Sequence, residues 1–161
     1  MTSNKDFVEV VVNDGTAQPR IIEFGICGDV NIESGVLVDI NSDGEIVKCP
    51  DLHGDETKSG AMPLGVALKD YSPGEVVSVV TGDGIVINAQ VDGVYNSNHV
   101  GTDLGLMLLG NGRGRLGYVY DNLEKHRRLA VLLSATTAII KTHKDDASHT
   151  GARYYARVLM V

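Results

Sequence analysis

Tight-turn sequences that separate short apolar runs are the feature that most constrains how this chain folds. The stretch PLGVALKDYSPGEVVSVVTGDG, residues 63–84, has one such turn at Ser72-Pro73-Gly74-Glu75. Proline fixes φ at the second position of a type II turn, and glycine accepts positive φ at the third. β-Branched runs of about four to eight residues between such turns are typical of strands. We therefore predict strands over 64–70, 75–81 and 85–91.

Two more strands are predicted nearer the N-terminus. FVEVVV, residues 7–12, is rich in β-branched side chains and alternates loosely. PRIIEFG, residues 19–25, begins with proline, which cannot donate to a strand ladder, so we expect this strand at a sheet edge.

The segment GVLVDINSDGEIVKC, residues 35–49, predicts a β-hairpin. With Asp43-Gly44 as the two central residues of a type I′ turn, apolar partners fall on one face and an opposite-charge pair on the other. The predicted partners are Ile40 with Val47, Val38 with Cys49, and Asp39 with Lys48.

The C-terminal third is less regular. Strands are predicted over 104–110, 114–121 and 152–161, with a polar loop over 141–151. Between them, residues 122–135 fit a helix capped by Asn122, whereas RLAVLLSATTAIIK fits β-structure equally well. The whole pattern predicts an all-β, mainly antiparallel, barrel-like domain, with one short helix allowed in this third.

Length and composition limit the function classes. A chain of 161 residues suits one well-cored domain, which we place at residues 13–161 behind an N-terminal arm of residues 1–12. We expect a soluble chain, because no apolar run approaches the roughly 20 residues that span a bilayer and the first residues do not form a secretory signal. Aromatic residues make up only 5%, which counts against a reader of bases or sugars.

Charge and cysteine content add two further expectations. Residues 1–100 carry 16 Asp+Glu and 5 Lys+Arg, whereas residues 101–161 carry 5 and 9, so the chain is electrically polarised. Opposite charges of this kind can dock a protein against neighbours or copies of itself, or simply form a mixed solvated surface. We interpret Cys27 and Cys49 as buried free thiols rather than a disulfide.

Several motifs invite a chemical reading, and we assign none of them a reaction. Gly112-Arg-Gly114-Arg-Leu-Gly117 matches GxGxxG, but a strand-like segment follows it where a nucleotide-binding loop needs a helix. The basic run 125–128 lacks the interleaved aromatics of a nucleic-acid site. Neither cysteine has a histidine placed beside it by the sequence. We predict no catalytic residue, cofactor or metal ion.

Two polar segments contain metal-ligating residue types. Neither has zinc or calcium spacing, so we interpret both as solvated loops. The first contains Asp51, His53, Asp55 and Glu56; the second contains His143, Asp145, Asp146 and His149.

Four segments carry a family resemblance. They are Cys27-Gly28-Asp29-Val30, Ser34–Val38, Pro63–Leu68 and Ser72–Val80. In this order they resemble the small β-domain of lambda-type head decoration proteins, also called capsid cement or stabilisation proteins, of tailed viruses. The likeness covers roughly residues 25–95 and a strand end at 152–161, whereas residues 103–151 match nothing in that family.

The resemblance implies a small β-barrel or β-tulip domain without enzymatic activity. Such proteins form trimers on the outer capsid surface at three-fold positions and staple neighbouring major capsid subunits. It therefore implies a homotrimer made in the host cytoplasm and located on the virion, with no nucleic-acid or membrane partner. The residues expected to contact the capsid are Phe7, Val8 and Val10 of the arm, which add a strand to a capsid subunit, and Arg127 and Arg128 of a basic underside.

Two other interpretations stay open. One is a different β-rich virion or binding module, such as a head fibre, a tail component or a carbohydrate-binding domain. The other is an enzyme with a small β-barrel, for which Asp51, His53 and Asp55 are the residues to test.

Overall fold

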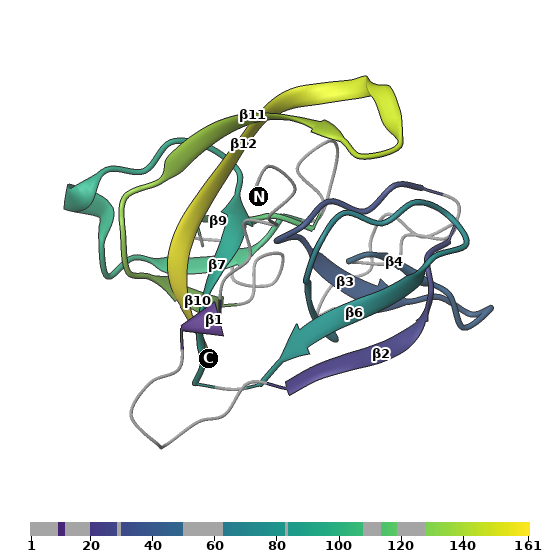
Figure 1. The fold of residues 1–161 in the computed structure, drawn as a ribbon. Coiled ribbons are helices and arrows are strands. Elements are labelled where there is room, and N and C mark those ends of the chain that lie inside the picture. The colour runs from purple at the N-terminus through teal and green to yellow at the C-terminus, as the bar shows by residue number, and fades with distance from the viewer. Residues whose placement is uncertain are drawn as a thin grey trace.

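The chain folds almost entirely into β-strands. The computed structural model describes residues 10–11, 20–28, 30–49, 63–82, 84–107, 114–118 and 128–161. These residues form twelve strands and one short 3₁₀ helix, η1 at Ser97–His99 (Figure 1). The predicted all-β, mainly antiparallel fold is confirmed. None of the described residues belongs to a helix long and apolar enough to cross a membrane.

A seven-stranded sheet contains most of the C-terminal half. Its strands are β1 Val10–Val11, β7 Val86–Val91, β8 Asp103–Leu106, β9 Leu116–Tyr118, β10 Arg128–Leu132, β11 Thr137–His143 and β12 Asp146–Met160. Their order is β1-β7-β9-β8-β10-β12-β11, and β7 also pairs with β12. Because of that second pairing, β7, β9, β8, β10 and β12 close into a five-stranded barrel.

A five-stranded sheet contains the N-terminal half. Its strands are β2 Arg20–Ile26, β3 Leu37–Ile40, β4 Ile46–Lys48, β5 Gly65–Ala67 and β6 Val76–Thr81, in the order β2-β6-β5-β3-β4. The predicted edge position of β2 is therefore confirmed. A bridge between Cys27 and Ile46 brings the end of β2 against β4, so this sheet also curls toward a barrel.

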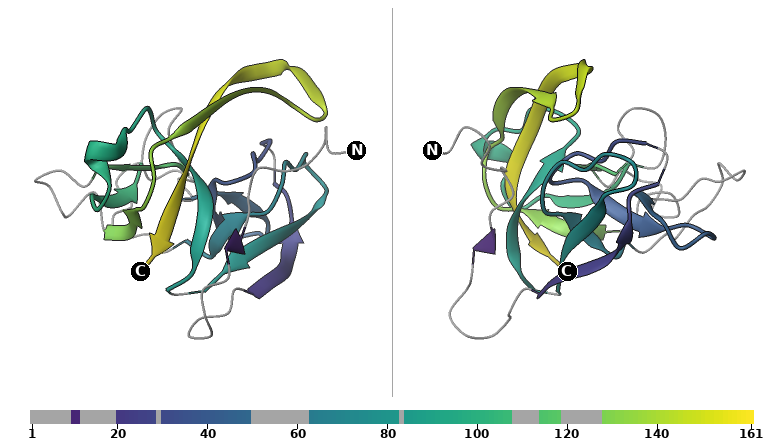
Figure 2. Two further views of the ribbon diagram at one scale, coloured as in Figure 1. Left: turned by 60° about the vertical axis from the view of Figure 1, so that its left-hand side comes forward. Right: turned by 45° about the vertical axis from the view of Figure 1, so that its right-hand side comes forward.

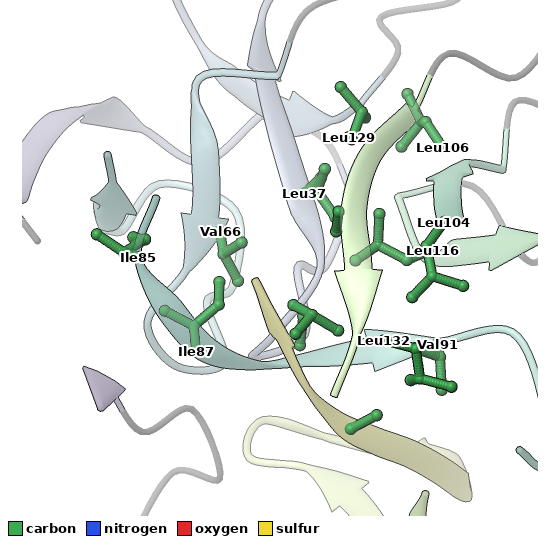
Figure 3. Packing of buried hydrophobic residues seen from close by; sticks show 14 of the residues in the cluster. Leu37, Val66, Ile85, Ile87, Val91, Leu104, Leu106, Leu116, Leu129 and Leu132 are labelled. Atoms are coloured by element: carbon green, nitrogen blue, oxygen red, sulfur yellow. The ribbon is translucent and has the colours of Figure 1, made fainter. Parts of the chain in front are cut away.

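The central strands of the five-stranded sheet are buried on both faces. Alternate side chains of a strand point to opposite faces, and here each face meets an apolar cluster. Val38, Ala67 and Val79 belong to the cluster inside the curled sheet. Leu37, Val66 and Val80 instead join residues of the seven-stranded sheet, including Ile87, Leu104, Leu116 and Leu132 (Figure 3). The second cluster joins the two sheets into one body.

The type II turn predicted at residues 72–75 is confirmed. The Glu75 backbone N–H donates to the Ser72 carbonyl oxygen at 3.1 Å, and Gly74 has φ of +90°. The turn leads directly into β6, as the sequence indicated.

In the C-terminal third the β alternative holds for residues 128–143, which form β10 and β11. Residues 122–127 lie outside the described part of the chain. The predicted polar loop over 141–151 is wrong, because Lys144 and Asp145 form a tight turn and β12 begins at Asp146. Polar residues mislead here because both strands run along the protein surface, where a polar face is compatible with β-structure.

The predicted hairpin exists, but its register is wrong by one residue. Val38 pairs with Lys48, Asp39 with Val47, and Ile40 with Ile46. The connection is longer than a type I′ turn: the Gly44 N–H donates to the Asn41 oxygen, and only Gly44 has positive φ. The Asn41 side chain accepts from the N–H groups of Asp43 and Glu45, so a local side-chain bond selects the longer turn.

Gly44→Ala should therefore destabilise the protein by about 1 kcal/mol, because alanine at φ of +81° is strained while nothing lies within 4 Å of the added Cβ. The matched change Gly44→Asn should cost less, since asparagine tolerates this conformation. Urea unfolding of the three proteins measures the difference. An alanine variant as stable as the original chain would contradict the turn geometry.

Candidate functional site

The predicted arm residues are only partly described. Val10 forms the short strand β1 with Val11, where it pairs with Ile87 of β7. This segment therefore belongs to the chain's own sheet, not to a free strand awaiting a capsid subunit. Phe7 and Val8 lie outside the described residues.

The predicted basic patch is likewise only half described. Arg128 begins β10, and its Nε lies 3.0 Å from Asp103 Oδ1, with both side chains about half exposed. An exposed pair of this kind contributes little stability and leaves the guanidinium accessible to a partner. Arg127 lies outside the described residues.

The two candidate metal segments have different outcomes. Asp51, His53, Asp55 and Glu56 all lie outside the described residues. Among the residues that the structure describes, no group of three or more metal-ligating side chains comes together. The histidines of the second segment lie instead on the β11–β12 hairpin and contact residues 32–33 and 71, which connect strands of the five-stranded sheet.

The two hairpin histidines have distinct partners. His143 is 1% exposed, and its Nε2 donates toward the Tyr71 carbonyl oxygen at 3.1 Å. The His149 Nε2 lies 2.7 Å from Glu33 Oε2, and the two imidazole rings stack with centroids 5.5 Å apart. These rings hold the hairpin against residues 32–34 and 70–72.

The far end of the β11–β12 hairpin extends past the barrel and over the five-stranded sheet (Figures 1 and 2). Its contacts there are polar. Arg153 donates two hydrogen bonds to Asp70, at 2.7 and 3.0 Å, and its Nε lies 3.6 Å from Glu33. All three side chains are almost fully buried. Near the turn, Lys144 contacts Glu75 at 2.6 Å in a more exposed pair.

Further hydrogen bonds are donated to the buried carboxylates of Glu33 and Asp70. Gln90 donates to Glu33 Oε1 at 2.9 Å and accepts a hydrogen bond from Arg115 Nε at 3.0 Å. The backbone N–H of Ser34 donates to Asp70 at 2.9 Å. Both carboxylates are therefore held in their charged form by several donors, which is the condition for burying charge without a large penalty.

The pKa values of Glu33 and Asp70 are both lowered, as these hydrogen bonds and ion pairs predict. Burial by itself raises the pKa of Glu33, but the Gln90 hydrogen bond and the nearby Arg153 and Arg115 charges hold that pKa below its ordinary value. Burial likewise raises the pKa of Asp70, and the bonds from Arg153 and Ser34 reverse the shift. The arrangement can fasten two parts of the chain together; it presents no acid kept protonated for proton transfer.

Stability should consequently fall in acid. A carboxylate whose folded pKa is lowered is protonated first in the unfolded chain, so stability is full above the ordinary values of 4.5 for Glu33 and 3.8 for Asp70 and declines as pH falls below them. Urea midpoints measured from pH 7 to pH 3 should stay level and then drop across that window. In Asp70→Asn the drop should be smaller; an equal drop in both proteins would assign the effect to other groups.

The cysteines and the glycine motif give no catalytic geometry. Cys27 and Cys49 are buried and neither forms a disulfide, as predicted. Burial, with the charges of Glu75 and Glu45, raises the pKa of Cys27 to about 11, which makes it a poor nucleophile. Gly117, the last glycine of the GxGxxG match, lies inside β9, whereas Gly112 and the residues after Tyr118 lie outside the described part of the chain.

A small apolar cavity lies where the two sheets meet, close to the C-terminus. Its volume is about 70 Å³, well below the 300 Å³ or more of typical ligand sites. The residues that line it include Val66, Val80, Ile85, Ile87, Leu129 and Met160, with no Asp, Glu, His, Lys or Arg side chain among its lining. Thr81 is the only lining residue with a polar side chain, so this cavity offers mainly apolar contact.

The buried network could have been suspected from the sequence in one place. Arg153 stands in the strand ARYYARVLMV in phase with Tyr155, on a face that is buried. A charged residue in phase with a buried face indicates a buried partner, but nothing local identifies that partner as Asp70. Comparison with known proteins adds no identity, since neither a protein-family model nor a curated protein matches this chain.

Proposed function

We propose that this protein is a non-enzymatic virion structural protein that binds the outside of a tailed-virus capsid as a trimer. In this role it cements neighbouring major capsid subunits through shape and repeated contacts. The proposal rests on the family resemblance and on the fold location of the segments that carry it.

The location of those segments is the single observation that carries the proposal. Residues 34–38 lead into β3 and include its first half, residues 63–68 contain β5, and residues 72–80 form the type II turn and most of β6. Cys27 contacts β4 at the closing bridge of the same sheet. All four segments thus belong to one curled five-stranded sheet, so the resemblance concerns a coherent structural unit and not scattered turns.

The rigidity of the molecule fits such a role. The two sheets share an apolar cluster, and the β11–β12 hairpin fastens them a second time through Arg153, Asp70 and Glu33. A clamp that holds partners through multiple weak contacts gains affinity when its contact points are held in fixed positions. Trimer formation then multiplies the modest affinity of each contact.

Cosedimentation with shells tests the proposal. The purified protein should pellet with expanded empty heads of the virus that encodes it and stay in the supernatant with unexpanded heads. Labelling should place it on the outer surface of the head. A protein that remains in the supernatant with both kinds of head would contradict the proposal, and binding to fibres, tails or glycans would favour the other β-rich modules.

Charge reversal tests the basic patch separately. Arg127→Glu with Arg128→Glu should lower shell occupancy, because an acidic shell then meets a repulsive surface. Arg157→Glu reverses one other exposed arginine, on β12, with half the charge change of the double variant, and should leave occupancy unchanged. Equal occupancy for all three proteins would rule out the patch as the docking face.

A further inference from the structure

Each sheet ends in a strand with one unpaired edge among the described residues. The five-stranded sheet begins with β2, whose C-terminal end meets β4 through the Cys27–Ile46 bridge while its N-terminal part has no neighbouring described strand on the outer side, and the seven-stranded sheet ends with β11. Both strands have seven residues. Exposed edges of this length are templates for adding another strand, and natural proteins usually shorten, charge or cover them.

The β2 edge is unusually apolar for an exposed strand. Six of its seven residues are exposed by at least a third, among them Ile21 at 58%, Phe24 at 39% and Ile26 at 49%. Val76, the partner of Ile26 on β6, adds a further exposed side chain at 52%. Although Arg20 and Glu23 are also exposed, this many exposed apolar side chains on the border strand of a sheet are typical of a protein interface.

The β11 edge also presents an exposed apolar surface. Ile140 is 83% exposed, the highest value among the large apolar side chains described. The outward face of the hairpin continues with Ala138 and Thr142 and, across the ladder, Thr150 and Ala152, none of which is charged. The one lysine of β11, Lys141, lies 4.0 Å from the buried Asp70 and is three-quarters buried.

We propose that these two edges are the two halves of one interface, in which β2 of one copy adds to β11 of the next copy. The occupant of each edge is thus a second copy of this chain. Opposite charge supports this choice. Among the described residues, the part of the chain that contains β2 (20–28, 30–49 and 63–82) carries 7 Asp+Glu and 3 Lys+Arg, whereas the part that contains β11 (84–107, 114–118 and 128–161) carries 4 and 6. Electrostatic attraction favours contact between surfaces of opposite charge over contact between surfaces of the same charge.

Such a contact is heterologous, because two different surfaces meet. Heterologous contacts close into rings when the rotation per copy divides a full turn, and a rotation of one third gives a trimer. The inference therefore deepens the trimeric part of the proposed function, and it does not depend on capsid binding.

Complementation between two edge variants tests the interface. Ile21→Lys with Phe24→Lys places charge on the β2 edge, and Ala138→Lys with Ile140→Lys places it on the β11 edge. All four side chains are exposed, so both variants should keep the circular dichroism spectrum and melting temperature of the original chain. Val94→Lys, at a side chain 71% exposed outside both edges, is the matched control.

In sedimentation equilibrium the original chain and the Val94→Lys control should form trimers, and each edge variant alone should be monomeric. An equimolar mixture of the two edge variants should form heterodimers. The intact β2 edge of one variant can pair with the intact β11 edge of the other, and no second pair of intact edges remains to extend the complex. A monomeric original chain, an edge variant that still self-associates, or a mixture that stays monomeric would overturn the proposal. Shell binding is measured in a separate experiment. A trimer that does not bind shells would therefore contradict the proposed function but not the proposed interface.

Discussion

Replacing Arg153 by methionine should lower the free energy of unfolding by about 3–5 kcal/mol, because removal of one partner leaves buried charges without compensation. Arg153 forms the two-bonded contact with Asp70 and also lies beside Glu33, and all three side chains are at most 4% exposed. For a chain of this length the loss corresponds to a fall in melting temperature of about 6–20 °C. Thermal and urea unfolding at pH 7 measure it.

Two further variants separate lost charge pairing from lost packing. Arg157→Met removes an exposed arginine from the same strand and should change stability by less than about 0.5 kcal/mol. Adding Asp70→Asn to the Arg153→Met variant removes one of the buried charges that has lost its partner. The double variant should therefore regain part of the lost free energy of unfolding. If the double variant is as unstable as the sum of the two single variants, the pair does not couple the hairpin to the sheet.

Gly65→Ala should be the most damaging small substitution in the five-stranded sheet, at about 3 kcal/mol, the upper range for overpacking a close-packed site. A Cβ at this position would lie 2.7 Å from Val79 Cγ1 and closer still to the Val80 carbonyl oxygen. Both atoms belong to β6, which is bonded to β5, so the clash can be relieved only by separating the two strands.

Gly151→Ala is the matched control for this substitution. Gly151 also lies in a strand, and a Cβ there meets nothing within 4 Å. Alanine in an open strand position should be neutral or slightly stabilising, since it restricts the unfolded chain. Chemical unfolding of both variants gives the comparison; equal stabilities would show that β5 and β6 are farther apart than described.

Features set by interactions between residues close together in the sequence are the easiest to predict, provided that every competing local hydrogen bond is taken into account. The turn at residues 72–75 was predicted correctly because proline and glycine act within four residues. The hairpin register was wrong although the segment is just as local, because the Asn41 side chain adds hydrogen bonds that favour a longer turn. An asparagine just before Ser-Asp-Gly is therefore a usable sequence signal for this longer turn.

The polar segment at 141–151 shows the opposite failure. Its composition is typical of a loop, but pairing with the preceding strand and contacts to Glu33 and Tyr71 make it part of a hairpin. Those partners lie more than 70 residues away along the chain. No periodicity within the segment carries that information.

The sequence alone predicts a β-protein with short strands, an edge strand at residues 19–25 and a type II turn at residues 72–75. These properties depend on backbone preferences and alternation, which act between near neighbours. Only the tertiary structure decided that two sheets share one core, that Arg153 meets Asp70 and Glu33, and that β11 is the last strand of its sheet among the described residues. Those outcomes depend on which distant strands close each barrel, and that choice is made by the burial of the whole chain at once.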